Sequence, residues 1–160
     1  MNRNHVLLAL ATLSVAGVAI AANAHYVRGP NASLNSPSVT VTWKSAGLGD
    51  NVIEEYRADA TASARYQCVN HGGNCPAASN KQQVSGNVSA FGAFSSGKNG
   101  TITGSLTLDP PASTLNCPGS QHAELTAASY TNIRLSDLTS GPLNTPTSPS
   151  SLSFSGPECP

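Results

Sequence analysis

The stretch YRADATASARYQC, residues 56–68, decides the fold class of this 160-residue chain. From Tyr56 to Cys68 every second residue is Ala, Tyr or Cys, and every residue between them is polar or charged. A period of two over this length is typical of a β-strand with one buried and one solvated face. A helix over the same residues would spread the charged side chains around its circumference and leave no apolar stripe. The alternation therefore predicts a strand, although alanine by itself favours helices.

The same alternation recurs in the segments 39–44, 101–108 and 124–135. A further strand is expected over 84–94, where a change of phase near Phe91 suggests a bulge at Gly92. Turn-forming residues separate these segments, and Lys98-Asn99-Gly100 is expected to join its two neighbouring strands as a hairpin. Six or seven strands with short loops, and no amphipathic helical window, predict an all-β fold. We expect an immunoglobulin-like, two-sheet antiparallel β-sandwich with disulfides.

The N-terminal residues have the pattern of a signal peptide. Arg3 precedes an uncharged apolar run, and Ala22-Asn23-Ala24 places small residues at the two positions that signal peptidase reads. The alternative is an uncleaved transmembrane anchor, because the run is just long enough to span a bilayer. No Lys or Arg cluster follows the run to stop its transfer. We therefore expect residues 1–24 to be removed, leaving a secreted protein, extracellular or periplasmic, with no integral membrane segment.

Charge and composition limit the partners and the domain organisation. The chain has 8 basic and 8 acidic residues, and removal of Arg3 with the signal peptide leaves a net charge of about −1. Nucleic-acid binding needs clustered Lys and Arg, which this sequence lacks, so no nucleic-acid partner is expected. We expect a β-sandwich domain over residues 25–138. From residue 139 to 160 the composition shifts to Ser, Thr and Pro, which predicts a mostly irregular tail held by Cys159.

Four cysteines lie in the predicted mature chain: Cys68, Cys75, Cys117 and Cys159. An even number in an exported chain favours disulfides over a zinc site, whose cysteines are usually two to four residues apart. Three pairings are possible, and the residues alone leave all three open. We favour Cys68 with Cys117, which would tie a strand to a later loop, and Cys75 with Cys159, which would hold the tail.

His25 is the candidate metal ligand, because cleavage after Ala24 makes it the first residue of the mature protein. An N-terminal histidine offers its amine and a ring nitrogen to one metal ion, and a second imidazole completes a three-nitrogen set that suits copper. His71 and His122 are the candidate second ligands, and His25 with His122 is the expected pair. The alternative is that His25 simply begins an edge strand.

No catalytic residue is assigned from the sequence, and we expect a protein that is not an enzyme. There is no Gly-x-Ser-x-Gly motif, and the adjacent Glu54 and Glu55 are expected on opposite faces of a strand rather than paired for glycoside cleavage. Outward-facing Thr, Ser and Asn side chains and a low net charge favour a protein that acts through its surface. We expect an envelope-associated, adhesive or self-assembling component, whose partners are cell-envelope components or further copies of itself. The alternative function is that of a copper carrier or oxidase-like copper site.

Short motifs in this chain resemble those of a group of small exported bacterial proteins of uncharacterised function. The residues are Ala24-His25-Tyr26-Val27, Ala46-Gly47-Leu48-Gly49-Asp50-Asn51, Cys68-Val69-Asn70-His71-Gly72-Gly73-Asn74, Lys81 and Asn116-Cys117-Pro118. The likeness extends across most of the predicted mature chain, up to about Leu135. The resemblance implies a secreted β-sandwich held by a Cys68–Cys117 disulfide. The group often has other residues at the positions of Cys75 and His71. This difference supports a separate Cys75–Cys159 disulfide, and it counts against His71 as a ligand common to the group.

Overall fold

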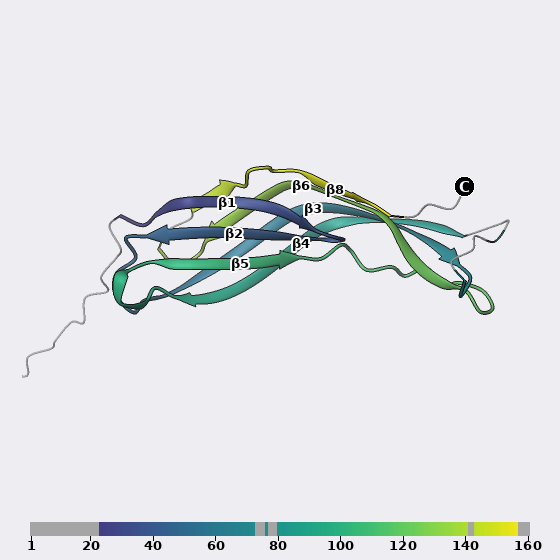
Figure 1. Ribbon diagram of the computed structural model, residues 1–160, viewed down its shortest axis with the longest axis horizontal. Helices are drawn as coiled ribbons and strands as arrows, with labels where there is room; N and C mark the ends of the chain where they lie inside the picture. The colour runs from purple at the N-terminus through teal and green to yellow at the C-terminus, as the bar shows by residue number, and fades with distance from the viewer. Residues whose placement is uncertain (1–22, 73–75, 77–79, 141–142, 157–160) are drawn as a thin grey trace, which may run out of the picture.

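The computed structural model describes residues 23–72, 76, 80–140 and 143–156, and strands dominate this part of the chain (Figure 1). One short 3₁₀ helix, η1 (Gly97–Asn99), lies between two strands. No helix among these residues is long and apolar enough to cross a bilayer. The strands in chain order are β1 (His25–Asn35), β2 (Ser38–Ala46), β3 (Ile53–Val69), β4 (Lys81–Ser95), β5 (Ile102–Leu108), β6 (His122–Asp137), β7 (Leu143–Pro146) and β8 (Leu152–Ser155).

The strands form two antiparallel sheets packed face to face. The smaller sheet has the order β1-β2-β5, and the larger has the order β4-β3-β6-β7, with β8 also paired to β6. The apolar residues between the sheets form one core. The predicted all-β, two-sheet sandwich is therefore confirmed.

Strand β3 is the centre of the larger sheet and pairs along its length with both β4 and β6. The alternation seen in the sequence matches its burial, because Tyr56, Ala58, Ala60, Ala62 and Ala64 are all buried. The strand prediction for this segment is confirmed. Its alanines bring little volume to the core, so most of the bulk comes from larger aliphatic and aromatic side chains on the other strands.

Trp43, Tyr56 and Phe94 form an aromatic cluster in the core between the two sheets. The ring centroid of Trp43 on β2 lies 4.8 Å from that of Tyr56 on β3 and 5.1 Å from that of Phe94 on β4. Gly104 on β5 is opposite Trp43 in the register, and a Cβ atom there would overlap Cζ2 of the indole. Gly104 is thus the residue that lets the largest side chain of the core lie flat beneath the smaller sheet.

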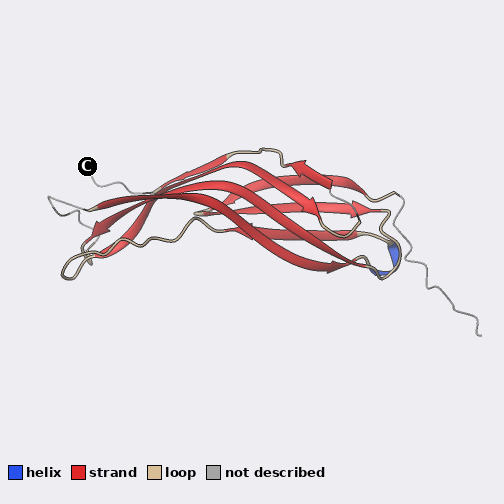
Figure 2. Cartoon of the chain, turned by 180° about the vertical axis from the view of Figure 1, so that it is seen from behind, coloured by secondary structure: helices blue, strands red, loops and turns tan. Residues whose placement is uncertain are grey.

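The strands β3, β4 and β6 extend well beyond one end of the smaller sheet (Figures 1 and 2). The irregular segment after β5 runs along this extension and takes the place of a second sheet. The Tyr66 hydroxyl donates to the carbonyl oxygen of Pro111 at 2.7 Å, and Thr114 bonds the side chain of Gln82. The Cys68–Cys117 disulfide, with Cα atoms 5.6 Å apart, fastens the same segment to β3. It is the first of the two disulfides favoured from the sequence.

The connection between β4 and β5 differs from the predicted hairpin. The two strands belong to different sheets, so η1 carries the chain from one sheet to the other. Gly97 and Gly100 both have φ near 60°, which lets the chain turn sharply on each side of η1. The Ser96 hydroxyl donates to the carbonyl oxygen of Gly49 at 2.6 Å and holds this turn against the loop before β3. The sequence signal for a turn was correct, but the prediction of a hairpin was wrong.

The expected bulge at Gly92 is also absent, since β3 and β4 pair from one end of β4 to the other without a shift in register. Phe91 instead points outward and is 66% exposed. A large apolar residue on the solvated face gave the false impression of a change in phase.

Within the predicted tail, residues 143–156 contain β7 and β8, which both pair with β6 and so belong to the larger sheet. Between them, the backbone N–H of Ser148 donates to Pro30 of β1 and the N–H of Thr147 donates to Ile133 of β6. This segment therefore closes one side of the sandwich. Residues 1–22, Cys75 and Cys159 lie outside the described residues, so the signal peptide and the Cys75–Cys159 disulfide stay predictions.

Candidate functional site

The two histidines expected to share a copper ion are not brought together. His25 begins β1, where Tyr26 pairs with Ser45, and the Ser45 hydroxyl lies 2.8 Å from the hydroxyl of Tyr56. Tyr56 in turn pairs with the last residue of β6, whereas His122 is the first residue of β6. A strand of this length spans about 50 Å. His25 and His122 therefore lie at opposite ends of the sandwich.

His71 is the residue that meets His122. Their rings are stacked, with centroids 5.8 Å apart, beside the end of β3. His25 has a different neighbour, because its Nδ1 lies 2.7 Å from the carbonyl oxygen of Asn23. In the part of the chain that the structure describes, no three His, Cys, Asp or Glu side chains form a group suited to a metal ion. Copper binding stays a prediction from the sequence.

Glu54 and Glu55 lie on opposite faces of β3, as predicted, and Glu54 has a buried acidic neighbour instead. Glu54 and Asp137 are each only 1% exposed. The Ser140 hydroxyl donates to Oε1 of Glu54 at 2.6 Å, and Oε2 is buried without a hydrogen-bond partner. Burial raises the pKa of Glu54, and the nearby charge of Asp137 raises it further, against the lowering effect of Ser140.

This acidic pair fits a structural role. The two residues come from neighbouring strands of the larger sheet, and Oδ1 of Asp137 accepts hydrogen bonds from the backbone N–H groups of Thr139 and Ser140. The pair thus ties the end of β6 to the start of β3. No pattern in the sequence indicates this contact, because Glu54 and Asp137 are far apart along the chain.

The feature that stands out as a functional surface is the free edge of β4. Strand β4 is the last strand on one side of the larger sheet, and no described strand other than β3 pairs with it. From Gln82 to Ser95 it contains no charged residue and no proline. Natural edge strands usually carry lysine, proline or a bulge, which prevent another chain from pairing with them. Strand β4 has none of these protections between its ends.

The middle of β4 lies between two segments of the strand that have further neighbours. Toward its C-terminal end, β4 lies beside β5, because a Cβ on Gly92 would contact Leu106, and Phe94 packs on Trp43. Toward its N-terminal end, Gln82 contacts Thr114. Gly86 lies between these contacts, and a Cβ added there would have no heavy atom within 4 Å. The residues around Gly86 are therefore the candidate site for pairing with another strand.

The side chains beside this edge are small and polar on the outer face of the sheet. Ser85 donates to the hydroxyl of Ser63 at 2.9 Å, Thr61 donates to Asn87 at 3.2 Å and Ser89 donates to Asp59 at 2.7 Å. These bonds run between β4 and β3 and hold the side chains flat against the sheet. They leave the backbone on the other side of β4 accessible to a further strand.

Fold and site together define a disulfide-bonded, all-β sandwich in which the β4 edge of the larger sheet is unprotected between Gln82 and Ser95. Comparison of the chain with protein-family models, with curated proteins and with solved structures finds no match. The resemblance to small exported bacterial proteins stays a prediction, and the function is argued below from the molecule itself.

Proposed function

We propose that this protein is an exported, non-enzymatic component that self-assembles, with two copies pairing through the free edges of β4. The observation that carries the proposal is the charge-free and proline-free edge strand from Gln82 to Ser95. Export accords with the Cys68–Cys117 disulfide, since disulfides persist mainly in oxidising compartments. A low net charge also leaves little repulsion between copies.

The proposed pairing joins two copies of β4 through a two-fold axis. Two copies of β4 related by a two-fold axis at Gly86 run antiparallel, and their backbone N–H and C=O groups complete the ladder that is open in the monomer. Residue 84 then lies opposite residue 88 of the second copy, and residue 82 opposite residue 90. No pair in this register places like charges together. A contact of this kind is self-complementary and closes as a dimer.

The test is the mass of the exported protein in solution, measured by size-exclusion chromatography with light scattering over a range of concentrations. We expect the mass to rise above that of the monomer as the concentration increases. Gly86→Lys places two lysines opposite each other across the two-fold axis and is expected to raise the dissociation constant by about tenfold or more. Gly86→Thr is the matched control: it occupies the same open space without a charge and is expected to associate like the unchanged protein.

Circular dichroism shows whether each variant keeps its strands. Both are expected to fold, because the space at Gly86 is open and its φ is not in the left-handed region. A protein that stays monomeric at every concentration, or a folded Gly86→Lys variant that associates as strongly as Gly86→Thr, would show that the β4 edge is not the assembly site.

A further inference from the structure

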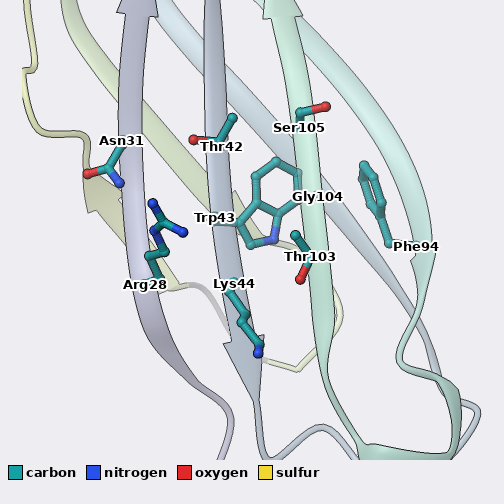
Figure 3. Close-up of a pocket in the computed structure, with 9 residues that line it drawn as sticks. All are labelled: Arg28, Asn31, Thr42, Trp43, Lys44, Phe94, Thr103, Gly104 and Ser105. Carbon is teal, nitrogen blue, oxygen red and sulfur yellow. The ribbon is translucent and has the colours of Figure 1, made fainter.

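The outer face of the smaller sheet contains an open hollow of about 700 Å³ (Figure 3). It lies over β1, β2 and β5, on the opposite side of that sheet from most of the core. A volume in this range is typical of sites that hold small molecules. The polar side chains that line it are Arg28, Asn31, Thr42, Lys44, Thr103 and Ser105.

Two cations on adjacent strands line this hollow (Figure 3). Arg28 on β1 is paired in register with Lys44 on β2, and both side chains are exposed. Like charges directly opposite each other on adjacent strands destabilise a sheet. None of the residues lining the hollow is acidic, and in the described part of the chain neither cation forms an ion pair. The hollow is therefore lined by two cationic side chains and no acidic one.

The backbone of β1 is irregular around Arg28, and two side chains of this strand line the hollow. The register with β2 shifts on both sides of Arg28, and Gly29 has a φ of 73° within this irregularity. Bulges of this kind commonly redirect side chains. In a regular strand, residues three positions apart point to opposite faces of the sheet. Because of the irregularity, Arg28 and Asn31 both line the hollow. Trp43 also lines it, and its indole Nε1 is buried without a hydrogen-bond partner.

We propose that this hollow binds an oligosaccharide that carries carboxylate groups. The cations require an anionic ligand, and the guanidinium of Arg28 suits a carboxylate because it donates two parallel hydrogen bonds. The hollow is much larger than a simple inorganic anion. Its remaining polar groups are the hydroxyls of Thr42, Thr103 and Ser105 and the amide of Asn31, which both donate and accept hydrogen bonds and so match sugar hydroxyls.

The experiment is calorimetric titration of the exported protein with tetragalacturonic acid and, separately, with its methyl ester, which has the same sugars without the charges. We expect the acid to bind and the ester to bind at least tenfold more weakly. The variant with both Arg28→Gln and Lys44→Gln is expected to lose at least tenfold in affinity for the acid. The control, Lys98→Gln with Arg134→Gln, removes the same net charge from exposed positions outside the hollow and is expected to bind like the unchanged protein.

Thermal unfolding without any ligand gives a second measurement. If the two cations repel each other in the free protein, the variant with both Arg28→Gln and Lys44→Gln melts at a higher temperature than the control variant. Three results would overturn the proposal: no binding of the acid, equal binding of the acid and its ester, or displacement of the acid by sulfate at the same concentration. The last result would mean that the hollow recognises any anion rather than a charged sugar.

Discussion

Gly104→Ala is the sharpest test of how the core is packed. The added Cβ would lie 2.8 Å from both Cε2 and Cη2 of Trp43 and would overlap Cζ2. The indole cannot easily move away, because Trp43 is only 2% exposed and packs against Tyr56 and Phe94. Forcing one extra carbon into a packed core typically costs about 1–3 kcal/mol. We expect the free energy of unfolding to fall by about that amount.

Urea denaturation of the exported protein, followed by tryptophan fluorescence and circular dichroism, measures this loss. Gly86→Ala is the control, since it makes the same change on a strand where no heavy atom lies within 4 Å. Alanine is favoured over glycine inside a strand by about 0.5–1 kcal/mol, so this control is expected to be as stable as the original or more stable. In a Trp43→Phe background, Gly104→Ala is expected to cost less, because the smaller ring leaves room. Equal losses at the two glycines, or a cost that does not change in the Trp43→Phe background, would refute the packing account.

Two further predictions concern the disulfide and the buried acid. Replacing Cys68 and Cys117 by alanine opens a loop whose ends are separated by 49 positions. The free energy of unfolding, measured in urea, is expected to fall by about 4 kcal/mol. A loss below about 1 kcal/mol would mean that the segment after β5 is held by its hydrogen bonds alone. Burial raises the pKa of Glu54 above its ordinary value of 4.5, so the fold loses stability as pH rises through the raised pKa. Glu54→Gln removes that loss. In urea titrations, the free energy of unfolding of the variant minus that of the original protein is therefore expected to increase between pH 4 and pH 7. If this difference stays constant or decreases, the pKa of Glu54 is not raised.

The strands could be predicted from the sequence because burial repeats with the pleat. The alternation that begins at Tyr56 reports directly which side chains face the core, and β3 follows it as far as Arg65. Beyond that point the register with β6 shifts, and Gln67, which the alternation places on the solvated face, is buried. Alternation is a local property, however, and says nothing about which strand lies beside which. The turn at Lys98 illustrates this. Its residues predict a change of direction, but only the strand order of the two sheets shows that the chain crosses from one sheet to the other there.

The candidate sites were hidden for the same reason. The uncharged segment from Gln82 onward is visible in the sequence, but it becomes an assembly surface only because β4 is the last strand of its sheet. Arg28 and Lys44 become one cationic site only through the register of β1 with β2. His25 and His122 are candidate ligands by residue type, and the length of β6 places them far apart. Long-range pairing, which no short segment encodes, determined each of these outcomes.

The two proposed surfaces lie on different sheets, and this separation has a consequence for how they work together. The hollow covers the smaller sheet and reaches β4 only at Phe94, which is about 25 Å along the strand from Gly86. In a dimer paired at Gly86, the hollow of each copy therefore stays open, and each dimer has two binding sites. A polymer with many carboxylate groups could then engage both, which strengthens binding without any new contact. Because the contacts are separate, Gly86→Lys is expected to leave the affinity for a single short oligosaccharide unchanged, and loss of the cations is expected to leave the association of copies unchanged.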